Sequence, residues 1–137
     1  AEKCGNKIGR ITTSGTITQY PIPTSNAQPQ FITSGPDGAL WFTESNAGKI
    51  GRITTSGSIT EHAISGQAPL GIVTGPDNAL WFAENGNDSI GRITTSGSFT
   101  QTPIPTQGSS PRTIAIGSDG KLWFTEYLGD NIGRLSP

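Results

Sequence analysis

The sequence predicts an all-β fold, a β-propeller built from four-stranded antiparallel blades. Each stretch of about 40 residues holds several short runs of β-forming residues, and Gly-, Pro- and Asp-rich turn signals separate the runs. A period near 40 with four short strands is typical of propeller blades. Two tripeptides define the period: Ile-Gly-Arg at 8–10, 50–52, 90–92 and 132–134, and Leu-Trp-Phe at 40–42, 80–82 and 122–124.

The repeat that begins at Pro29 shows the expected strands in order. Gly-Pro-Asp-Gly at 35–38 has the residues of a tight turn between the first two strands. The second strand has apolar side chains on both of its faces, so we expect it to lie between two neighbouring blades. A Thr-Ser-Gly turn joins the third strand to the fourth. From the axis outward, the four strands are expected at 31–34, 39–44, 50–54 and 58–64.

The number and order of the expected strands indicate that residues 1–137 form a single array of propeller blades. The first segment holds only the third and fourth strands of a blade, and the last segment lacks the outer strand. The chain therefore carries about three blades, whereas closed rings contain about four or more. The expected divisions are 1–28 (partial blade), 29–68 (blade), 69–110 (blade) and 111–137 (blade without its outer strand).

This shortage of blades predicts that the chain assembles with itself. The N-terminal outer strand, 16–20, could complete the last blade of another copy in a head-to-tail contact until the ring closes. A homodimer with six blades is the favoured assembly, and a trimer with nine is the other option. The extra third strand at 8–12 has no assigned place in this scheme.

Charge and composition exclude several function classes. The formal net charge is −1 and no basic cluster occurs, so neither nucleic acid nor an anionic membrane is an expected partner. No apolar run is long enough for a membrane helix. Cys4 is the single cysteine, which excludes an intrachain disulfide or a thiolate metal cluster. The sequence favours a soluble chain, with an extracellular location as one option, and assigns no compartment.

Residues present in every copy are best explained by blade architecture. We expect the repeated Glu and Arg to form hydrogen bonds or ion pairs between blades, and the repeated Trp to pack there. His62, the single histidine, falls in an outer strand and is expected at the surface or between blades. No catalytic or metal-binding residue is therefore assigned. The repeated residues are Glu2, Glu44, Glu84 and Glu126, Arg10, Arg52, Arg92 and Arg134, and Trp41, Trp81 and Trp123.

Candidate binding residues lie where the copies differ. Ligands of propellers usually bind at the channel mouth, formed by the linkers between blades and the loops after the second strands. Here the linkers are 23–28, 65–68 and 105–110, and both they and the loops vary. The predicted mouth residues are Gln30, Phe31, Leu70, Arg112 and Thr113 at the starts of the inner strands, with Asn46, Asn87, Asp88, Tyr127 and Asp130 in the loops.

The motifs Gly-Pro-Asp-Gly-x-Leu-Trp-Phe-Thr-Glu at 35–44 and Ile-Gly-Arg-Ile-Thr-Thr-x-Gly at 50–57 resemble the repeat of the virginiamycin B lyase (streptogramin lyase) family. The resemblance covers essentially the whole chain. It implies a seven-bladed propeller in one longer chain. It also implies ring opening of a cyclic depsipeptide antibiotic by elimination, with a magnesium ion and with histidine and glutamate side chains on one face.

The chain departs from that pattern in its blade number and its single histidine. The favoured function is therefore a self-assembling, non-catalytic scaffold or binding module, with no cofactor. One alternative is a magnesium-dependent streptogramin B lyase, active in antibiotic resistance and assembled across subunits. The other is a carbohydrate-binding propeller that uses the Trp side chains and Tyr127 between its blades.

Overall fold

A computed structural model describes residues 1–65 and 67–137, so Gly66 of the predicted linker 65–68 lies outside the described residues. The described residues contain no helix that could cross a membrane. The strands are β1 (Lys7–Ile11), β2 (Ile17–Pro21), β3 (Pro29–Ser34), β4 (Leu40–Glu44), β5 (Lys49–Ile53), β6 (Ile59–Ala63), β7 (Pro69–Thr74), β8 (Leu80–Glu84), β9 (Ser89–Ile93), β10 (Phe99–Pro103), β11 (Pro111–Ile116), β12 (Leu122–Glu126) and β13 (Asn131–Leu135).

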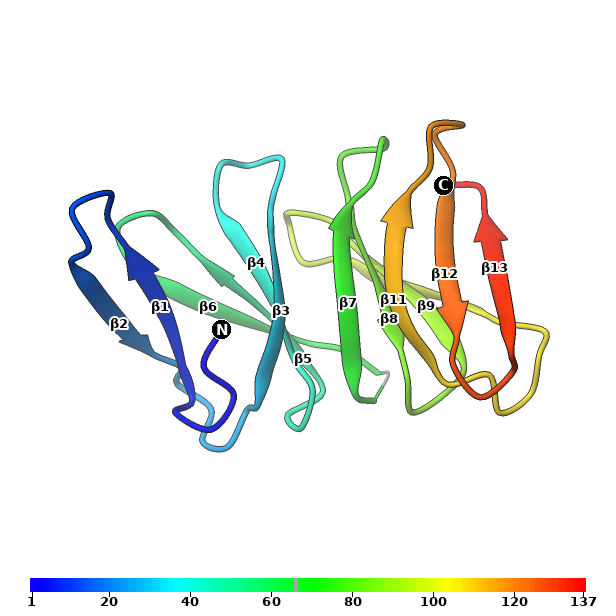
Figure 1. Cartoon of the computed structure of the whole chain (residues 1–137), viewed down its shortest axis with the longest axis horizontal. Coiled ribbons are helices and arrows are strands. Elements are labelled where there is room, and N and C mark those ends of the chain that lie inside the picture. Colours follow the sequence, from blue (N-terminus) through cyan, green and yellow to red (C-terminus); the bar gives the residue numbers. More distant parts are fainter. Residues whose placement is uncertain (66) are drawn as a thin grey trace.

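These strands form four antiparallel sheets that follow one another in chain order (Figure 1). Two sheets have four strands, β3-β4-β5-β6 and β7-β8-β9-β10. The hairpin β1-β2 lies at one end of the stack and the three-stranded sheet β11-β12-β13 at the other. The prediction of an all-β fold with four-stranded antiparallel sheets is confirmed. The number of blades in a complete ring and its completion by another copy remain predictions.

Tight turns set the register within each sheet. At the turn after β5, the Gly57 amide donates to the Thr54 carbonyl at 2.9 Å, and Gly57 has a φ of 94°. Such a positive φ suits glycine, which has no Cβ to clash with the backbone. The Thr54 hydroxyl oxygen accepts from the Ser58 amide at 3.1 Å. The Thr-Ser-Gly motif therefore closes the hairpin between β5 and β6 as the sequence predicts.

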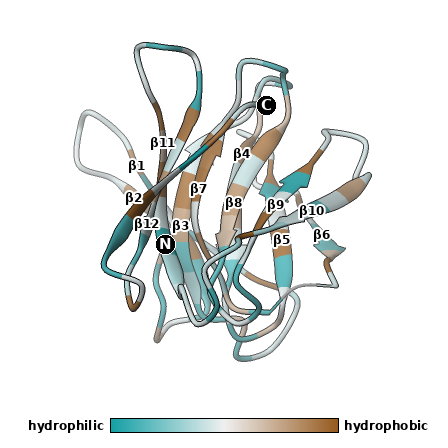
Figure 2. Cartoon of the chain, turned by 90° about the vertical axis from the view of Figure 1, so that its right-hand side faces the viewer, coloured by the Kyte–Doolittle hydropathy of each residue, from teal (hydrophilic) through white to brown (hydrophobic). Residues whose placement is uncertain are grey.

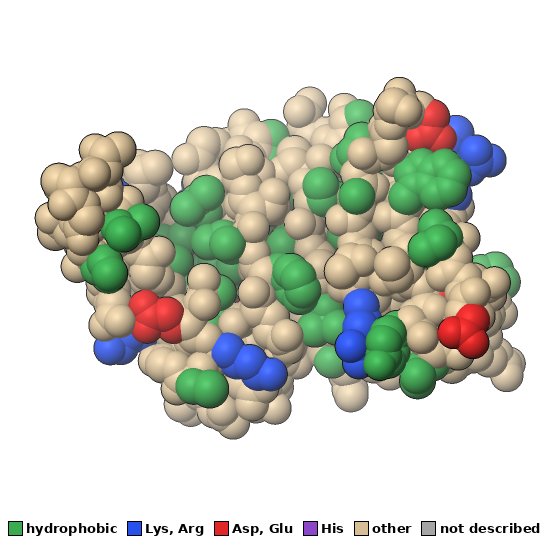
Figure 3. All heavy atoms as spheres, in the orientation of Figure 1, with side chains coloured by type: hydrophobic (Ala, Val, Ile, Leu, Met, Phe, Trp, Pro, Cys, Tyr) green, Lys and Arg blue, Asp and Glu red, His purple; other side chains and the backbone are tan. Residues whose placement is uncertain are grey.

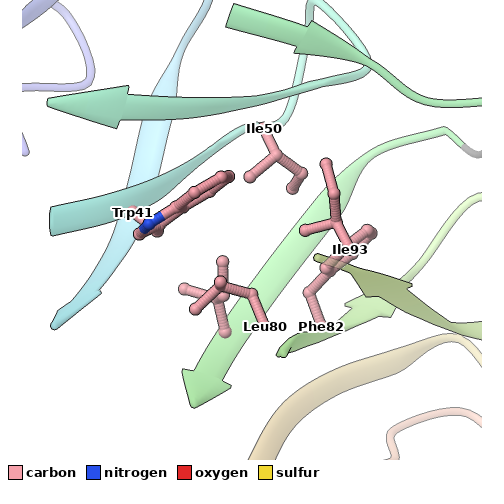
Figure 4. Close-up of a cluster of buried hydrophobic side chains, with 6 residues drawn as sticks. Trp41, Ile50, Leu80, Phe82 and Ile93 are labelled. Carbon is pink, nitrogen blue, oxygen red and sulfur yellow. The ribbon is translucent and has the colours of Figure 1, made fainter. Parts of the chain in front are cut away.

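The hydrophobic core lies between successive sheets, not inside any one of them. Trp41 and Ile50 project from the second sheet toward Leu80, Phe82 and Ile93 of the third (Figure 4). Equivalent clusters join the third sheet to the fourth, and the hairpin to the second sheet. Figure 2 shows the hydrophobic stretches on the strands that face one another in the stack. The prediction that Trp packs between sheets is confirmed for Trp41 and Trp81, whereas Trp123 is 38% exposed.

Three of the four repeated arginines, Arg52, Arg92 and Arg134, pair with the turn aspartate of their own sheet, so the prediction of contacts between blades is wrong for them. In the second sheet, Asp37 accepts from the Trp41 indole at 3.0 Å and from the Arg52 Nε at 2.6 Å. Burial acts to raise the pKa of Asp37, but the hydrogen bonds from Trp41, Arg52 and the Ala39 amide, together with the Arg52 charge, outweigh it and hold the pKa below its usual value. The turn aspartate therefore ties its own strands together. Asp77 binds Trp81 and Arg92 in the same way.

Candidate functional site

The starts of the inner strands β3, β7 and β11 carry an irregularity that sequence analysis missed. In each strand the register shifts just after the first proline, between Pro29 and Ile32 in β3, for example. Between the paired positions, two residues of the inner strand therefore lie opposite one residue of its neighbour, which is the pattern of a β-bulge. A bulge changes the direction of the side chains that it contains. The bulged pairs are Gln30 and Phe31, Leu70 and Gly71, and Arg112 and Thr113.

The three bulges lie together, because β7 packs directly against both β3 and β11. Gly71 permits this approach. A Cβ at Gly71 would lie 2.8 Å from the Arg112 carbonyl oxygen and 2.8 Å from the Thr113 Cα, closer than real Cβ atoms approach. The positions equivalent to Gly71 hold Phe31 and Thr113 in the neighbouring strands. Glycine at the central strand therefore lets the side chains on either side share one space.

That space is a hollow of about 610 Å³, here called the mouth hollow. It is open to solvent and lies on the side of the stack that carries the β4–β5 and β8–β9 loops, which contribute Ser45, Asn46 and Asn85 to its lining. Six of the ten predicted mouth residues line it: Gln30, Phe31, Asn46, Leu70, Arg112 and Thr113. The other residues in its lining are Gln28, Ser45, Ala68 and Asn85.

The mouth hollow combines apolar side chains with fixed amides. Phe31 is 38% exposed although it is a large apolar side chain. The Gln30 amide donates to the Ser45 hydroxyl at 2.8 Å, and the Asn85 amide donates to the Ser110 hydroxyl at 2.7 Å. Each amide is thus oriented by a bond to its surroundings and keeps further polar capacity. This mixture of a few placed polar groups and apolar surface is typical of small-molecule sites.

Arg112 is the one charged residue in this lining, and Tyr127 fixes its position. The guanidinium carbon of Arg112 lies 3.5 Å from the centre of the Tyr127 ring. This is a stacked cation–π contact, which holds the cation without neutralising its charge. Tyr127, the seventh predicted mouth residue, is therefore placed beside the hollow through Arg112. The N–H groups of Arg112 stay available to carbonyl or carboxylate oxygens of a ligand.

The remaining predicted residues lie outside this lining. The Asp88 carboxylate accepts from the Gly108 amide at 2.7 Å and from the Ser110 amide at 2.9 Å. Hydrogen bonds from these linker amides lower the pKa of Asp88. Asn87 takes part in its own loop, where its carbonyl accepts from the Ser89 hydroxyl at 3.1 Å. Asp130 is exposed, with a φ of 51°.

Asp88 thus acts as a linker clamp, and the same position serves this role near the N-terminus. There Asn6 accepts from the Ala27 amide at 2.8 Å and donates to the Thr24 carbonyl at 2.9 Å. The sequence signal was present, since Asn6, Asp88 and Asp130 occupy equivalent positions before a third strand. Of these three, Asp88 and Asp130 are predicted from the sequence as mouth residues. The clamps instead set the path of the linkers that lead into β3 and β11.

Replacing Asp88 by Ala is expected to lower the free energy of unfolding by about 2 kcal/mol, because linker amides lose a charged acceptor. Asp130→Ala, at the equivalent but exposed position, is the matched control and is expected to change stability by less than about 0.5 kcal/mol. Urea denaturation of both variants checks this. Equal losses in the two variants would show that Asp88 does not act through the linker.

His62 lies between sheets, as predicted, and away from the mouth hollow. Its ring stacks on Trp41 with 5.4 Å between the ring centres. Burial lowers the pKa of His62, and the nearby Arg52 charge lowers it further. Among residues 1–65 and 67–137, no three side chains of His, Cys, Asp and Glu are grouped closely enough to hold a metal ion. The expected absence of a cofactor remains a prediction.

Comparisons with known proteins identify a family. The family model described as the virginiamycin B lyase family matches residues 1–137. No curated protein sequence matched the chain.

Solved structures match the fold over nearly the whole chain. Virginiamycin B lyase from Staphylococcus aureus is 49% identical with a TM-score of 0.96, and a catalytically inactive His-to-Ala variant of that enzyme with quinupristin is 50% identical with a TM-score of 0.96. A streptogramin B lyase is 43% identical with a TM-score of 0.94. Each alignment covers 98% of this chain, but 47%, 47% and 46% of the respective matched chains. The chain therefore spans about half the length of these relatives.

Proposed function

Because the chain belongs to the virginiamycin B lyase family, we propose that it is a non-catalytic binding module whose mouth hollow holds a cyclic depsipeptide of the streptogramin B type. The observation that carries this proposal is the convergence of three bulges on one hollow. Side chains that differ between the repeats meet there, whereas the repeated side chains build the core. A specific binding site needs side chains of different chemistry at one place, and the positions that differ between the repeats supply them.

The chemistry of the mouth hollow suits this class of ligand. A volume of about 610 Å³ is within the range of small-molecule sites. A cyclic depsipeptide presents apolar side chains together with amide and ester carbonyls. Phe31 and Leu70 offer apolar contact, and Arg112 offers N–H donors to carbonyl oxygens. The quinupristin reported with the related S. aureus enzyme is the ligand to test.

The proposal that the chain binds without catalysis rests on the position of its single histidine, His62. The related S. aureus enzyme is catalytically inactive when one histidine is replaced by alanine, and the structure of that inactive variant was determined with quinupristin. The one histidine of this chain is His62, which stacks on Trp41 in the core and contributes nothing to the hollow lining. The carbohydrate alternative is less favoured, because two of the three Trp side chains, Trp41 and Trp81, are buried and cannot stack on a sugar, and Trp123 alone is exposed.

Isothermal titration with quinupristin, followed by reversed-phase chromatography coupled to mass spectrometry, tests the proposal. We expect saturable binding and recovery of the antibiotic at its original retention time. Ring opening by elimination would shift the retention at unchanged mass, whereas hydrolysis would add the mass of a water. A shift at unchanged mass would establish the lyase alternative. Absence of binding would reject the proposed ligand class.

Arg112→Ala is expected to weaken quinupristin binding about tenfold, which corresponds to about 1.4 kcal/mol. The variant removes the charged donors of the hollow and leaves Tyr127 in its loop. Arg10→Ala, an exposed arginine on β1 outside the hollow lining, is the control and should bind like the unmodified chain. Titration of both variants gives the comparison. If Arg10→Ala has the same effect, the ligand binds elsewhere.

A further inference from the structure

A second hollow, of about 550 Å³, adjoins the mouth hollow, and we call it the side groove. It lies between the β4–β5 loop of the second sheet and the linker into the third, and both of these sheets have all four strands. Ser45, Asn46 and Ala68 line both hollows. The side groove is therefore a lateral branch of the mouth hollow, and a ligand bound at the mouth can extend into it.

The side groove lies where one clamp side chain is missing. Gly48 stands two residues before the Ile-Gly-Arg motif of β5, and the other copies have Asn6, Asp88 and Asp130 at this position. All four residues have a positive φ, from 49° to 60°, so the backbone is alike and only the side chain differs. Asn6 and Asp88 bind the linkers that lead into β3 and β11. Gly48 has no side chain that could reach the linker into β7.

The linker into β7 is also two residues shorter than the others. It spans 65–68, whereas the linkers into β3 and β11 span 23–28 and 105–110. Its described part lies against the β8–β9 loop, where the Gly86 amide donates to the Gln67 carbonyl at 3.1 Å. A Cβ at Gly86 would lie 2.9 Å from the Gln67 Cβ, so glycine allows this close approach. A short linker held against the third sheet leaves the space beside Gly48 open.

The side groove is polar but uncharged. Ser45, Asn46, Ser65 and Gln67 contribute hydroxyl and amide groups, and no charged side chain belongs to its lining among the described residues. The Asn46 amide donates to the Asn26 carbonyl at 3.0 Å, which fixes its orientation where the two hollows meet. In Figure 3, charged side chains form only scattered spots on the face shown. An uncharged group that forms hydrogen bonds therefore suits the side groove, and peptide amides are such groups.

We propose that the side groove is a subsite for one edge of the depsipeptide ring, and that Gly48 is the residue that admits this edge. The inference rests on the proposed function. The apolar side chains and Arg112 of the mouth hollow contact the body of the ring, and the amides along one edge exchange hydrogen bonds with Asn46 and Gln67. Gly48 determines specificity, because a clamp side chain at this position would occupy the space that the ring edge needs.

The substitution Gly48→Asn tests the proposal. Asparagine suits the backbone there, since Asn6 at the equivalent position has a φ of 52° and Gly48 has a φ of 60°. Its side chain would fill part of the side groove and leave the residues of the mouth hollow unchanged. We expect this variant to bind quinupristin about tenfold more weakly than the unmodified chain in isothermal titration.

Gly38→Asn is the matched control, because it makes the same substitution at another glycine of positive φ. Gly38 has a φ of 75° in the β3–β4 turn, and Asn78 holds the equivalent position in the next repeat. A Cβ at Gly38 meets nothing within 4 Å. The turn lies at the other end of β4 from the side groove, so this variant should bind quinupristin like the unmodified chain.

Amide NMR of the isotope-labelled, unmodified chain gives a second measurement that needs no substitution. Addition of quinupristin is expected to shift the amide resonances of Gly48 and Gly86 in the side groove, together with those of Leu70 and Thr113 in the mouth hollow. Shifts at Leu70 and Thr113 without shifts at Gly48 and Gly86 would overturn the subsite.

The titrations separate a failure of the subsite from a failure of the proposed function. If the unmodified chain does not bind quinupristin, the proposed function is wrong and the subsite with it. If the unmodified chain and Gly48→Asn bind equally well, only the subsite is overturned. Equal weakening by Gly48→Asn and Gly38→Asn would also overturn the subsite, because the effect would then not arise in the side groove.

Discussion

Raising the pH from about 5 to about 9 is expected to lower the free energy of unfolding by an amount on the order of a few kcal/mol. The cause is a pair of glutamates at the ends of β4 and β8. Glu44 and Glu84 are fully buried, and their carboxylate oxygens have no hydrogen-bond partner among the described residues. Burial, and then the charge of Glu61, raises the pKa of Glu44 to about 8. Burial raises the pKa of Glu84 to about 7.

The sign follows from proton binding in the two states. In the unfolded chain both carboxyls ionise near 4.5, whereas in the folded chain they keep their protons to higher pH. Their contribution to stability is therefore complete below about pH 4.5 and is lost as the pH rises through 7 and then 8. His62 has the opposite slope, since its lowered pKa favours the folded state as the pH rises through 6.5. Above about pH 6.5 the two glutamates dominate the slope.

Urea denaturation at about pH 5, 6.5 and 9 measures this dependence. The double variant Glu44→Gln and Glu84→Gln cannot ionise at these positions, so its stability should be nearly constant between about pH 6.5 and 9. Glu2→Gln, at the equivalent but only partly buried position, controls for the substitution itself. A wild-type stability that stays level or rises over this interval would contradict the assignment of protonated glutamates.

The sequence predicted the strands and their order because it contains two regular patterns. One is the repeat of about 40 residues, and the other is the alternation of side chains between the two faces of a strand. Alternation within 39–44 identified a strand covered on both faces, and β4 is such a strand, with Phe42 and Trp41 buried against opposite neighbours. The role of the turn aspartates was not predicted. Asp37 was read as a turn residue, which it is, but its bonds to Trp41 and Arg52 join positions 4 and 15 residues away. Such pairings follow from strand register, which a repeat alone does not specify.

Six of the predicted mouth residues line one hollow because variation between copies marks the positions that the fold does not constrain. Asp88 varies for a different reason. It clamps the longer linker into β11, whereas the corresponding residue before β5 is Gly48. The bulges at Gln30 and Arg112 were also missed, since an extra residue in a strand leaves no clear mark in a sequence without an aligned partner strand.

Gly91→Ala is expected to lower the free energy of unfolding by about 3 kcal/mol, although the backbone at Gly91 permits alanine. The reason is the side chain of the next strand. A Cβ at Gly91 would overlap the Phe82 ring and lie 2.9 Å from a Glu84 oxygen. Phe82 cannot move aside, because it is 0% exposed and its ring also stacks on Phe99. The Gly of the Ile-Gly-Arg motif in β5, β9 and β13 is thus the surface on which a Phe of the neighbouring strand lies.

Gly9→Ala is the matched control for this argument, because Gly9 occupies the same motif position in β1. The sheet β1-β2 has no neighbouring strand with a phenylalanine, and a Cβ at Gly9 would meet only the end of the Glu2 side chain. That side chain is flexible and can shift, so a loss below about 1 kcal/mol is expected. Thermal and urea denaturation of both variants measures the difference. Equal losses would show that strand propensity, rather than the Phe82 ring, selects glycine in the motif. A selective loss at Gly91 would show that the repeated tripeptide records the packing of one strand on the next.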